Sequence, residues 1–423
     1  MSKLSLAISC PIDTYSGYGA RARDFVKAVL ATEKYNVQIL SQRWGNTRFG
    51  YLEDHKEDEL ASLIVPNLTA PPDIWVQHTV PNEFQKVGKF NIGLTAGIET
   101  TVVPANWLDG VNKMDLLIVS SEHGKNVFEQ TKIDVLDERT KQIQRTIKLE
   151  TKTEVLFEGV DINKYFAKAK STLDLSEIKE QFCYLFVGHW LKGDFAQDRK
   201  NIGYTIKAFL ESFKNKQTPP ALILKTHHAT SSILDREAVL DKIDRIRKTV
   251  KGKLPNIYLF HGDITDQEMN ELYNHPKVKV LINLTKGEGF GRPLLEFTQA
   301  KKPIIASGWS GHIDFLDKSK AIMIGGTLQK VHPSAADDFI LKEAQWFTPD
   351  DAQVGKAFRE TFKHYKKYLS LAKELGTRNK KEFSFNAMKN KLDEILDKNL
   401  PEFPKKIELT LPKLDLPKLE KIG

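Results

Sequence analysis

A glycine-rich stretch between a strand-like run and a helical pattern constrains the fold of this chain most strongly: Leu284-Thr-Lys-Gly-Glu-Gly-Phe-Gly-Arg-Pro-Leu-Leu-Glu296. The apolar run from Val278 to Leu284 predicts a buried strand, and a helical pattern runs from Pro293 to about Ala300. Glycine lets the backbone approach a ligand closely, and proline suits the first position of a helix. The stretch therefore predicts a strand–loop–helix unit, the building block of α/β proteins.

The predicted helix start is an anion site, because several free N–H groups and the positive end of the helix dipole point the same way. A diphosphate fits such a site. Two carboxylates frame the loop, Glu288 before the glycines and Glu296 in what we expect to be the first helical turn. Glu288 is placed to reach past a phosphate to a sugar, and Glu296 is placed to reach toward a ribose. The loop therefore suggests a nucleotide-sugar site, although each feature taken singly is common in α/β proteins.

Strand-like apolar runs recur in two series, each interleaved with helical patterns. The expected strands are residues 4–12, 36–40, 74–77, 90–94, 116–119 and 153–156 in the first series, and 184–188, 221–225, 257–260 and 278–284 in the second. Such alternation predicts a doubly wound parallel sheet in each half of the chain. Residues 131–152 are charged and hold few large apolar side chains, which predicts a surface insertion or hairpin.

The loop after the first strand, Ser16-Gly17-Tyr-Gly19, is expected to lead into a helix from Ala20 to about Thr32. Loops at the carboxyl ends of strands bind ligands in open α/β sheets, so we expect Gly17 and Gly19 to border the site. The two glycines also match the dinucleotide fingerprint weakly. That fingerprint needs an acidic residue after the second strand, where this chain has Ser41-Gln-Arg-Trp44, which disfavours a dehydrogenase.

Taken together, Thr285, the run Glu288-Gly-Phe-Gly291, and Glu296 eight positions after the first glutamate resemble the donor-site motif of the family-4 glycosyltransferases. The resemblance implies an α/β protein with the GT-B fold, in which two Rossmann-like doubly wound domains face each other across a cleft and the last helix crosses back to the first domain. The implied division is an acceptor-binding domain over residues 1–170, a nucleotide-sugar domain over 175–365, returning helices over 366–400 and an extended tail over 401–423.

The resemblance also implies roles for charged residues near the donor. Lys200 matches the lysine that neutralises the leaving diphosphate, while His189 stands where the family has an arginine, which leaves Arg199 as the alternative. Basic residues at a helix start oppose the dipole, and this favours an anionic ligand. Glu99 lies where some relatives place a histidine facing the acceptor. The residues implied to be catalytic are Glu288, Lys200, Arg199 and Glu99, and those implied to bind the donor are Gly17, Gly19, Lys225, Thr285, Gly289, Phe290, Gly291, Arg292 and Glu296.

The composition, 40% hydrophobic and 28% charged, is that of a soluble globular protein. No apolar run reaches the roughly 18 residues of a membrane span, and the N-terminus predicts a strand, so we expect a cytoplasmic protein without a transmembrane segment. Cys10 and Cys183 lie in strand-like runs and predict no disulfide. The chain has no Asp-x-Asp pair, so we expect no metal and no cofactor, with the nucleoside-diphosphate sugar as co-substrate.

The resemblance implies retaining transfer of a hexose or pentose from a nucleoside-diphosphate sugar to the hydroxyl of a glycan, a protein or DNA. A net charge of +8 and basic segments at 248–253 and 378–381 suit an anionic acceptor. The proline- and lysine-rich tail after Leu400 resembles phage-encoded glycosyltransferases, so hydroxymethylated bases of phage DNA, reached in the host cytoplasm, are an alternative acceptor. A nucleotide-sugar epimerase is the alternative from another class.

Overall fold

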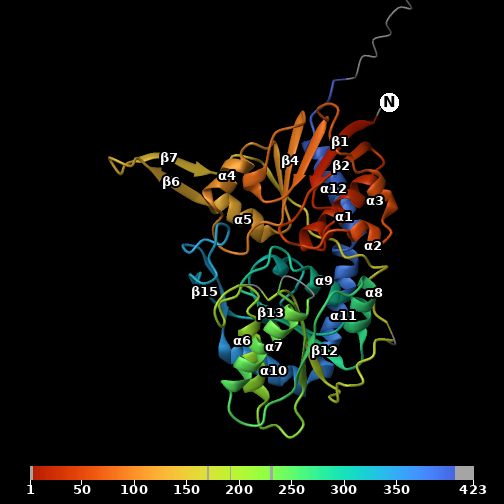
Figure 1. Cartoon of the computed structure of the whole chain (residues 1–423), viewed down its shortest axis with the longest axis vertical. Helices are drawn as coiled ribbons and strands as arrows, with labels where there is room; N and C mark the ends of the chain where they lie inside the picture. Colours follow the sequence, from red (N-terminus) through yellow and green to blue (C-terminus); the bar gives the residue numbers. More distant parts are fainter. Residues whose placement is uncertain (1–2, 169–170, 191, 229–231, 405–423) are drawn as a thin grey trace, which may run out of the picture.

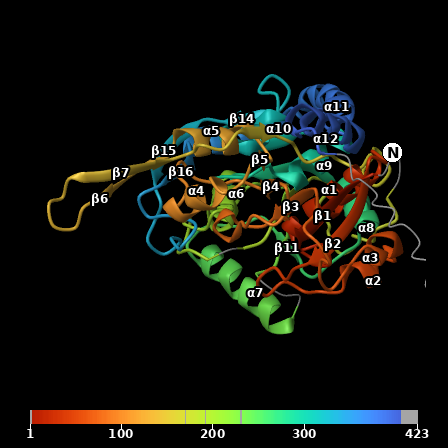
Figure 2. The ribbon, with the colours of Figure 1, turned by 90° about the horizontal axis from the view of Figure 1, so that it is seen from above.

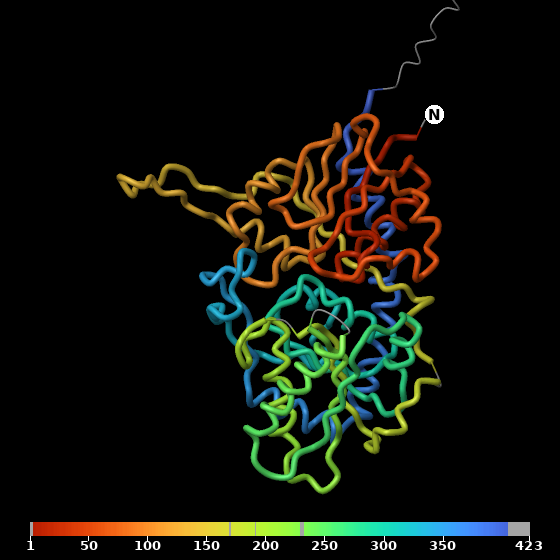
Figure 3. The backbone as a smooth tube through the Cα atoms, in the orientation of Figure 1, coloured from red at the N-terminus to blue at the C-terminus, as the bar shows by residue number. Residues whose placement is uncertain are grey.

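The computed structural model describes residues 3–168, 171–190, 192–228 and 232–404. Two α/β domains lie one above the other in Figure 1, the N-terminal one in red to yellow and the C-terminal one mostly in green to blue. Figure 3 traces the same path, in which the blue end of the chain returns from the lower domain to the upper one.

The N-terminal domain holds a parallel six-stranded sheet in the order β2-β1-β3-β4-β5-β8. Its inner strands β3 and β5 are buried along their whole length, as expected for a parallel sheet covered on both faces. The strands are β1 Leu4–Cys10, β2 Tyr35–Ser41, β3 Ile74–His78, β4 Phe90–Thr95, β5 Leu116–Val119 and β8 Thr153–Val155, and the helices are α1 Gly17–Leu30, α2 Tyr51–Asp54, α3 Asp58–Ser62, α4 Ala105–Val111 and α5 Glu122–Gln130.

The C-terminal domain holds a second parallel six-stranded sheet in the order β11-β10-β9-β12-β13-β14. The strand order reverses between the neighbours β9 and β12, and open α/β sheets bind ligands at such a switch point. The elements are β9 Cys183–Val187, α6 Ile202–Phe213, β10 Ala221–Lys225, α7 Ile233–Lys248, β11 Ile257–Phe260, α8 Asp266–Asn274, β12 Val278–Asn283, α9 Arg292–Gln299, β13 Ile304–Ser307, β14 Ile322–Ile324, β15 Gly326–Lys330, β16 Gln345–Pro349, α10 Asp351–Lys363 and α11 Tyr365–Glu382.

The last helix, α12 (Phe385–Asn399), joins the N-terminal domain. Met388, Leu392 and Ile395 on this helix are buried in the same core as Ile8 of β1 and Phe25 of α1. The predicted return of the last helix is therefore confirmed. Most of the predicted extended tail, from residue 405 onward, lies outside the described residues.

The charged segment predicted as a surface insertion is an antiparallel hairpin of β6 (Lys132–Leu136) and β7 (Ile143–Lys148). It projects sideways from the N-terminal domain, away from both sheets, as Figures 1 and 2 show. The prediction of a hairpin is confirmed.

The first glycine loop differs from its prediction. Helix α1 begins at Gly17 rather than Ala20, because the side chain of Ser16 caps it by accepting a hydrogen bond from the Gly19 amide. A Cβ atom at Gly19 would lie 2.3 Å from the carbonyl oxygen of Thr14, so this glycine permits close backbone packing. The two glycines belong to the first helical turn, and Gly19 is buried.

Candidate active site

The switch point of the C-terminal sheet brings the two predicted charged loops together. The loop after β9 ends at Arg199 and Lys200, and the loop after β12 contains Glu288. Backbone bonds join these loops, since the Lys286 amide donates to the Arg199 carbonyl at 2.8 Å. The buried hydroxyl of Thr285 donates to the Arg199 and Gly287 carbonyls at 3.1 and 2.9 Å. Thr285, predicted to bind the donor, thus positions the loop.

Glu288 and Lys200 form a buried ion pair. The Lys200 ammonium donates to both carboxylate oxygens of Glu288 at 2.7 Å. Burial raises the pKa of Glu288, but the positive charges of Lys200 and Arg199 outweigh burial and hold that pKa at about 2. Glu288 is therefore ionised at neutral pH, while burial lowers the pKa of Lys200 and the charge of Glu288 opposes that shift.

A second ion pair comes from the other domain. The Arg199 guanidinium lies 3.0 Å from a carboxylate oxygen of Glu99, in the segment after β4, and 3.7 Å from Glu288. The four residues predicted to be catalytic thus form one cluster of two cations and two carboxylates, built from both domains. His189, the other candidate for the arginine role, is exposed and packs its ring 4.3 Å from that of His227. Arg199, which contacts both Glu99 and Glu288, therefore supplies the cluster's second cation.

The glycine loop is pressed against the N-terminal domain. A Cβ atom at Gly287 would lie 2.0 Å from the Glu99 carbonyl oxygen, and one at Gly289 would lie 2.8 Å from the Ala96 carbonyl oxygen. The Ser121 hydroxyl, which caps α5, donates to the Gly289 carbonyl at 2.7 Å. These glycines therefore let the two domains close on each other around the charge cluster.

Helix α9 starts one residue earlier than predicted. Gly291 takes a left-handed φ of 97° as its N-cap, a conformation that favours glycine, so the helix begins at Arg292. Glu296 consequently lies in the second turn rather than the first. Its carboxylate accepts hydrogen bonds from Arg292 Nε at 3.1 Å and from the Tyr273 hydroxyl at 3.3 Å. Burial raises the pKa of Glu296 to about 7.

Arg292 is enclosed by carboxylates from both domains. Its guanidinium lies 2.5 Å from Asp24 of α1, 3.7 Å from Glu158 and 3.1 Å from Glu296. Our sequence prediction did not include Asp24 or Glu158 in the site. No local signal reveals them, because their role depends on contacts across more than a hundred residues of chain. Arg292 is thus an interdomain ion-pair residue at the start of α9.

The other predicted donor residues lie in different settings. Gly17 is exposed and, with Arg292 and Asp24, lines a hollow of about 240 Å³ between the domains. The ring of Phe290 is buried in the C-terminal core, 5.0 Å from that of Phe315. Lys225, at the end of β10, donates to the Gly262 carbonyl at 2.5 Å, away from the cluster's ion pairs. Phe290 therefore anchors the loop, and Lys225 lies elsewhere along the same sheet edge.

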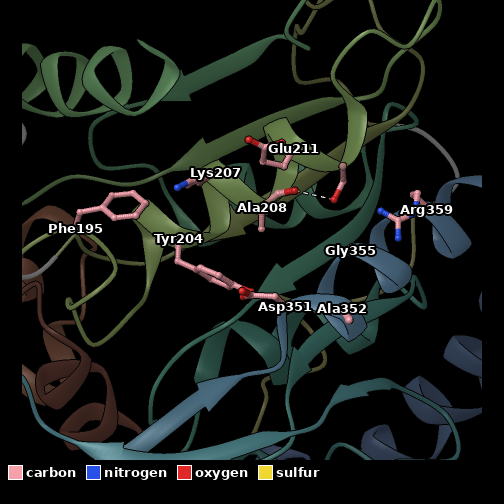
Figure 4. Close-up of a pocket in the computed structure, with 10 residues that line it drawn as sticks. Phe195, Tyr204, Lys207, Ala208, Glu211, Asp351, Ala352, Gly355 and Arg359 are labelled. Carbon is pink, nitrogen blue, oxygen red and sulfur yellow. Dashed lines mark hydrogen bonds between the residues drawn. The ribbon is translucent and has the colours of Figure 1, made fainter. Parts of the chain in front are cut away.

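A separate hollow of about 390 Å³ lies between α6 and α10 (Figure 4). The Tyr204 hydroxyl donates to Asp351 at 2.6 Å across one end of it. None of the predicted site residues lines this hollow, so it is distinct from the charge cluster. Within the described part of the chain, no group of three or more His, Cys, Asp or Glu side chains is arranged to hold a metal ion, and no helix is long and apolar enough to cross a membrane.

Comparisons with known proteins give the fold. No protein-family profile and no curated protein sequence matches the chain. Solved structures do match: HepE from Anabaena with UDP and glucose, at 13% identity and a TM-score of 0.57, covers 93% of this chain and 100% of its own. A glycosyltransferase from Rickettsia africae, at 13% identity and a TM-score of 0.60, covers 95% of this chain and 99% of its own. Sucrose-phosphate synthase from Thermosynechococcus elongatus, at 11% identity and a TM-score of 0.60, covers 94% of this chain and 99% of its own. The chain therefore has the GT-B fold over nearly its whole length, as the sequence predicts.

Proposed function

We propose that this protein is a retaining glycosyltransferase that moves a sugar from a nucleoside-diphosphate sugar to an acceptor hydroxyl. One observation supports this above all. Two largely buried cations, Arg199 and Lys200, lie beside the loop that leads into α9, at the switch point of the C-terminal sheet. Cations at such a point suit a diphosphate.

The charge cluster indicates how the residues would act on the donor. Breaking the sugar–phosphate bond develops negative charge on the leaving diphosphate and positive charge on the sugar ring. Arg199, Lys200 and the loop amides would stabilise the diphosphate electrostatically. Without donor, Glu288 and Glu99 occupy these cations. Donor binding would exchange the carboxylates for phosphate oxygens, which frees Glu288 to accept hydrogen bonds from sugar hydroxyls.

The remaining roles follow from position. Glu296, four residues along α9 from Arg292, would hold the ribose. Retention would arise by attack of the acceptor on the face from which the diphosphate leaves, with the departing phosphate helping to take the acceptor proton. Acceptors would reach the donor from the N-terminal domain, because Glu99 of that domain already lies in the cluster.

UDP-sugars are the first donors to test, since HepE was solved with UDP-glucose and the E. coli trehalose-6-phosphate structure with UDP-2-fluoro glucose. Glycan, protein and DNA acceptors are all compatible with the site. No observation favours the epimerase alternative over transfer.

The test is a panel of nucleoside-diphosphate sugars with mass-spectrometric detection of nucleoside diphosphate, with and without acceptors. Transfer should be followed by proton NMR of the new glycosidic bond. We expect one donor to be consumed, faster with acceptor, and the anomeric configuration of the donor to be kept. An inverted product would contradict retention, and free epimerised nucleotide sugar would identify an epimerase.

A further inference from the structure

The β6–β7 hairpin presents an exposed ribbon that the donor chemistry does not use. All side chains from Glu138 to Thr146 are exposed. Figures 1 and 2 both show the hairpin standing clear of the two domains. Its base is anchored, because Ile147 is buried in the N-terminal core and Ile133, its cross-strand partner, packs against that core. The ribbon is thus a fixed projection of the acceptor-side domain.

The second half of this ribbon, from the turn through strand β7, is strongly cationic. Residues 139–149 include Arg139, Lys141, Arg145 and Lys148 and no Asp or Glu. Within the described residues, none of these four cations has an ion-pair partner at salt-bridge distance. An ordinary soluble surface mixes charges of both signs.

Two carboxylates in the first half of the ribbon, Asp134 and Asp137, accept hydrogen bonds from within the hairpin. Asp134 accepts a hydrogen bond from the Thr146 hydroxyl at 2.6 Å, across the hairpin. Asp137 accepts the Arg139 and Thr140 amides in the turn at 3.0 and 2.7 Å, and these bonds lower its pKa. The carboxylates thus shape the hairpin, while the cations face solvent.

We propose that this hairpin binds duplex DNA, with its cations on the phosphates. Neighbouring strands lie about 4.8 Å apart, so the ribbon is narrow enough for the DNA major groove, which is roughly 12 Å wide and admits a two-stranded ribbon. Gln142 and Gln144, both exposed, carry amides of the kind that bond to base edges.

The apolar content of the ribbon argues against a lipid surface as its partner. Leu136 and Ile143 face each other in register and are 50% and 61% exposed. They form a single aliphatic pair, and the adjoining turn bears Thr140, Lys141 and Gln142 rather than apolar side chains. Such a turn would have to bury polar groups to enter a bilayer, which is unfavourable.

This inference deepens the proposed function by naming duplex DNA as the acceptor-side partner. The acceptor role rests on the proposed glycosyl transfer, but DNA binding does not. The proposal of DNA binding and the proposal of glycosyl transfer can therefore fail separately, provided that DNA binding is measured without donor and donor cleavage is measured without DNA.

The experiment compares the full chain with the variant Arg139→Ala/Lys141→Ala/Arg145→Ala/Lys148→Ala. A matched control removes four exposed lysines elsewhere, Lys318→Ala/Lys330→Ala/Lys356→Ala/Lys366→Ala, and so changes the net charge equally. Fluorescence anisotropy gives the affinity for a duplex oligonucleotide as salt is raised, and thermal melting confirms that each variant is folded. The same proteins are sedimented with vesicles of phosphatidylcholine and phosphatidylglycerol.

We expect the hairpin variant to bind the duplex at least tenfold more weakly than the control at low salt. Its log–log salt slope should fall by about 0.9 for each cation that contacts a phosphate. Equal affinities of the hairpin variant and the control, or absence of duplex binding by the wild type, would overturn the proposal. Vesicle binding lost only in the hairpin variant, with no duplex binding, would assign the hairpin to membranes and also overturn it.

Discussion

The ammonium of Lys200 lies 2.7 Å from both carboxylate oxygens of Glu288, and both side chains are largely buried. The same lysine is the residue that we propose to neutralise the leaving diphosphate. Donor and carboxylate therefore compete for one cation, and this competition has measurable consequences.

Glu288→Gln should destabilise the protein by about 3 kcal/mol, because it leaves Lys200 buried without a counter-charge. UDP should then raise the melting temperature of this variant more than that of the wild type, since the diphosphate no longer competes with a carboxylate. Differential scanning fluorimetry with and without UDP measures both effects. The control is Glu374→Gln at an exposed glutamate of α11. A smaller UDP response in Glu288→Gln than in the wild type would contradict the competition.

Gly287→Ala should separate the domains at the cluster, because the new methyl group would lie 2.0 Å from the Glu99 carbonyl oxygen. Overpacking of this kind costs on the order of 1–3 kcal/mol. We expect loss of transfer activity together with a larger radius of gyration by small-angle scattering. Gly355→Ala is the control, since only the tip of the Arg359 side chain is near and alanine favours the helix. An unchanged radius and activity in Gly287→Ala would show that the close contact is not needed.

The free energy of unfolding should depend on pH through the titration of Glu296. Burial raises its pKa to about 7, from about 4.3 in an unfolded chain. A raised carboxyl pKa means that the folded state binds the proton more tightly. The protonation of Glu296 therefore stabilises the folded state fully below about pH 4.3, and this contribution is lost as pH rises through about 7. Urea titrations at pH 5 and pH 8 should show the wild type losing up to about 3 kcal/mol more than Glu296→Gln between these values. Equal losses in both proteins would remove Glu296 as the titrating group.

Metal independence is a further prediction. The described residues offer no cluster of metal ligands, and Arg199 and Lys200 supply positive charge where a metal would otherwise bind the diphosphate. Turnover should be unchanged by EDTA. Activity abolished by EDTA and restored by Mn²⁺ would contradict this assignment.

Much of the fold follows from local sequence. The second series of strands was predicted to within one residue at each end, because continuous apolar runs such as Ala221–Lys225 mark strands that are buried on both faces. The meeting of Lys200 with Glu288 could also be anticipated, but only through the family motif. The contact between Lys200 and Glu288 depends on the pairing of strands β9 and β12, which no local sequence pattern predicts.

Other features could not be read from the sequence. Arg292 looks like a donor contact in its own loop, whereas Asp24 and Glu158 reach it from the other domain. Glu296 was assigned to the first turn because Pro293 suits the first helical position, yet the left-handed Gly291 starts the helix at Arg292. One residue of difference at a helix start changes which turn a carboxylate occupies.

The rate of sugar transfer by Lys200→Ala tests the central claim most directly. Once the donor panel has identified a substrate, kcat/KM should be measured for the wild type, for Lys200→Ala and for Lys207→Ala, a lysine on α6 that points to the ring of Phe195. If Lys200 stabilises the leaving diphosphate, its removal costs about 3 kcal/mol in the transition state, and kcat/KM should fall roughly a hundredfold while Lys207→Ala stays near wild type. Activity of folded Lys200→Ala within about twofold of wild type would contradict the account.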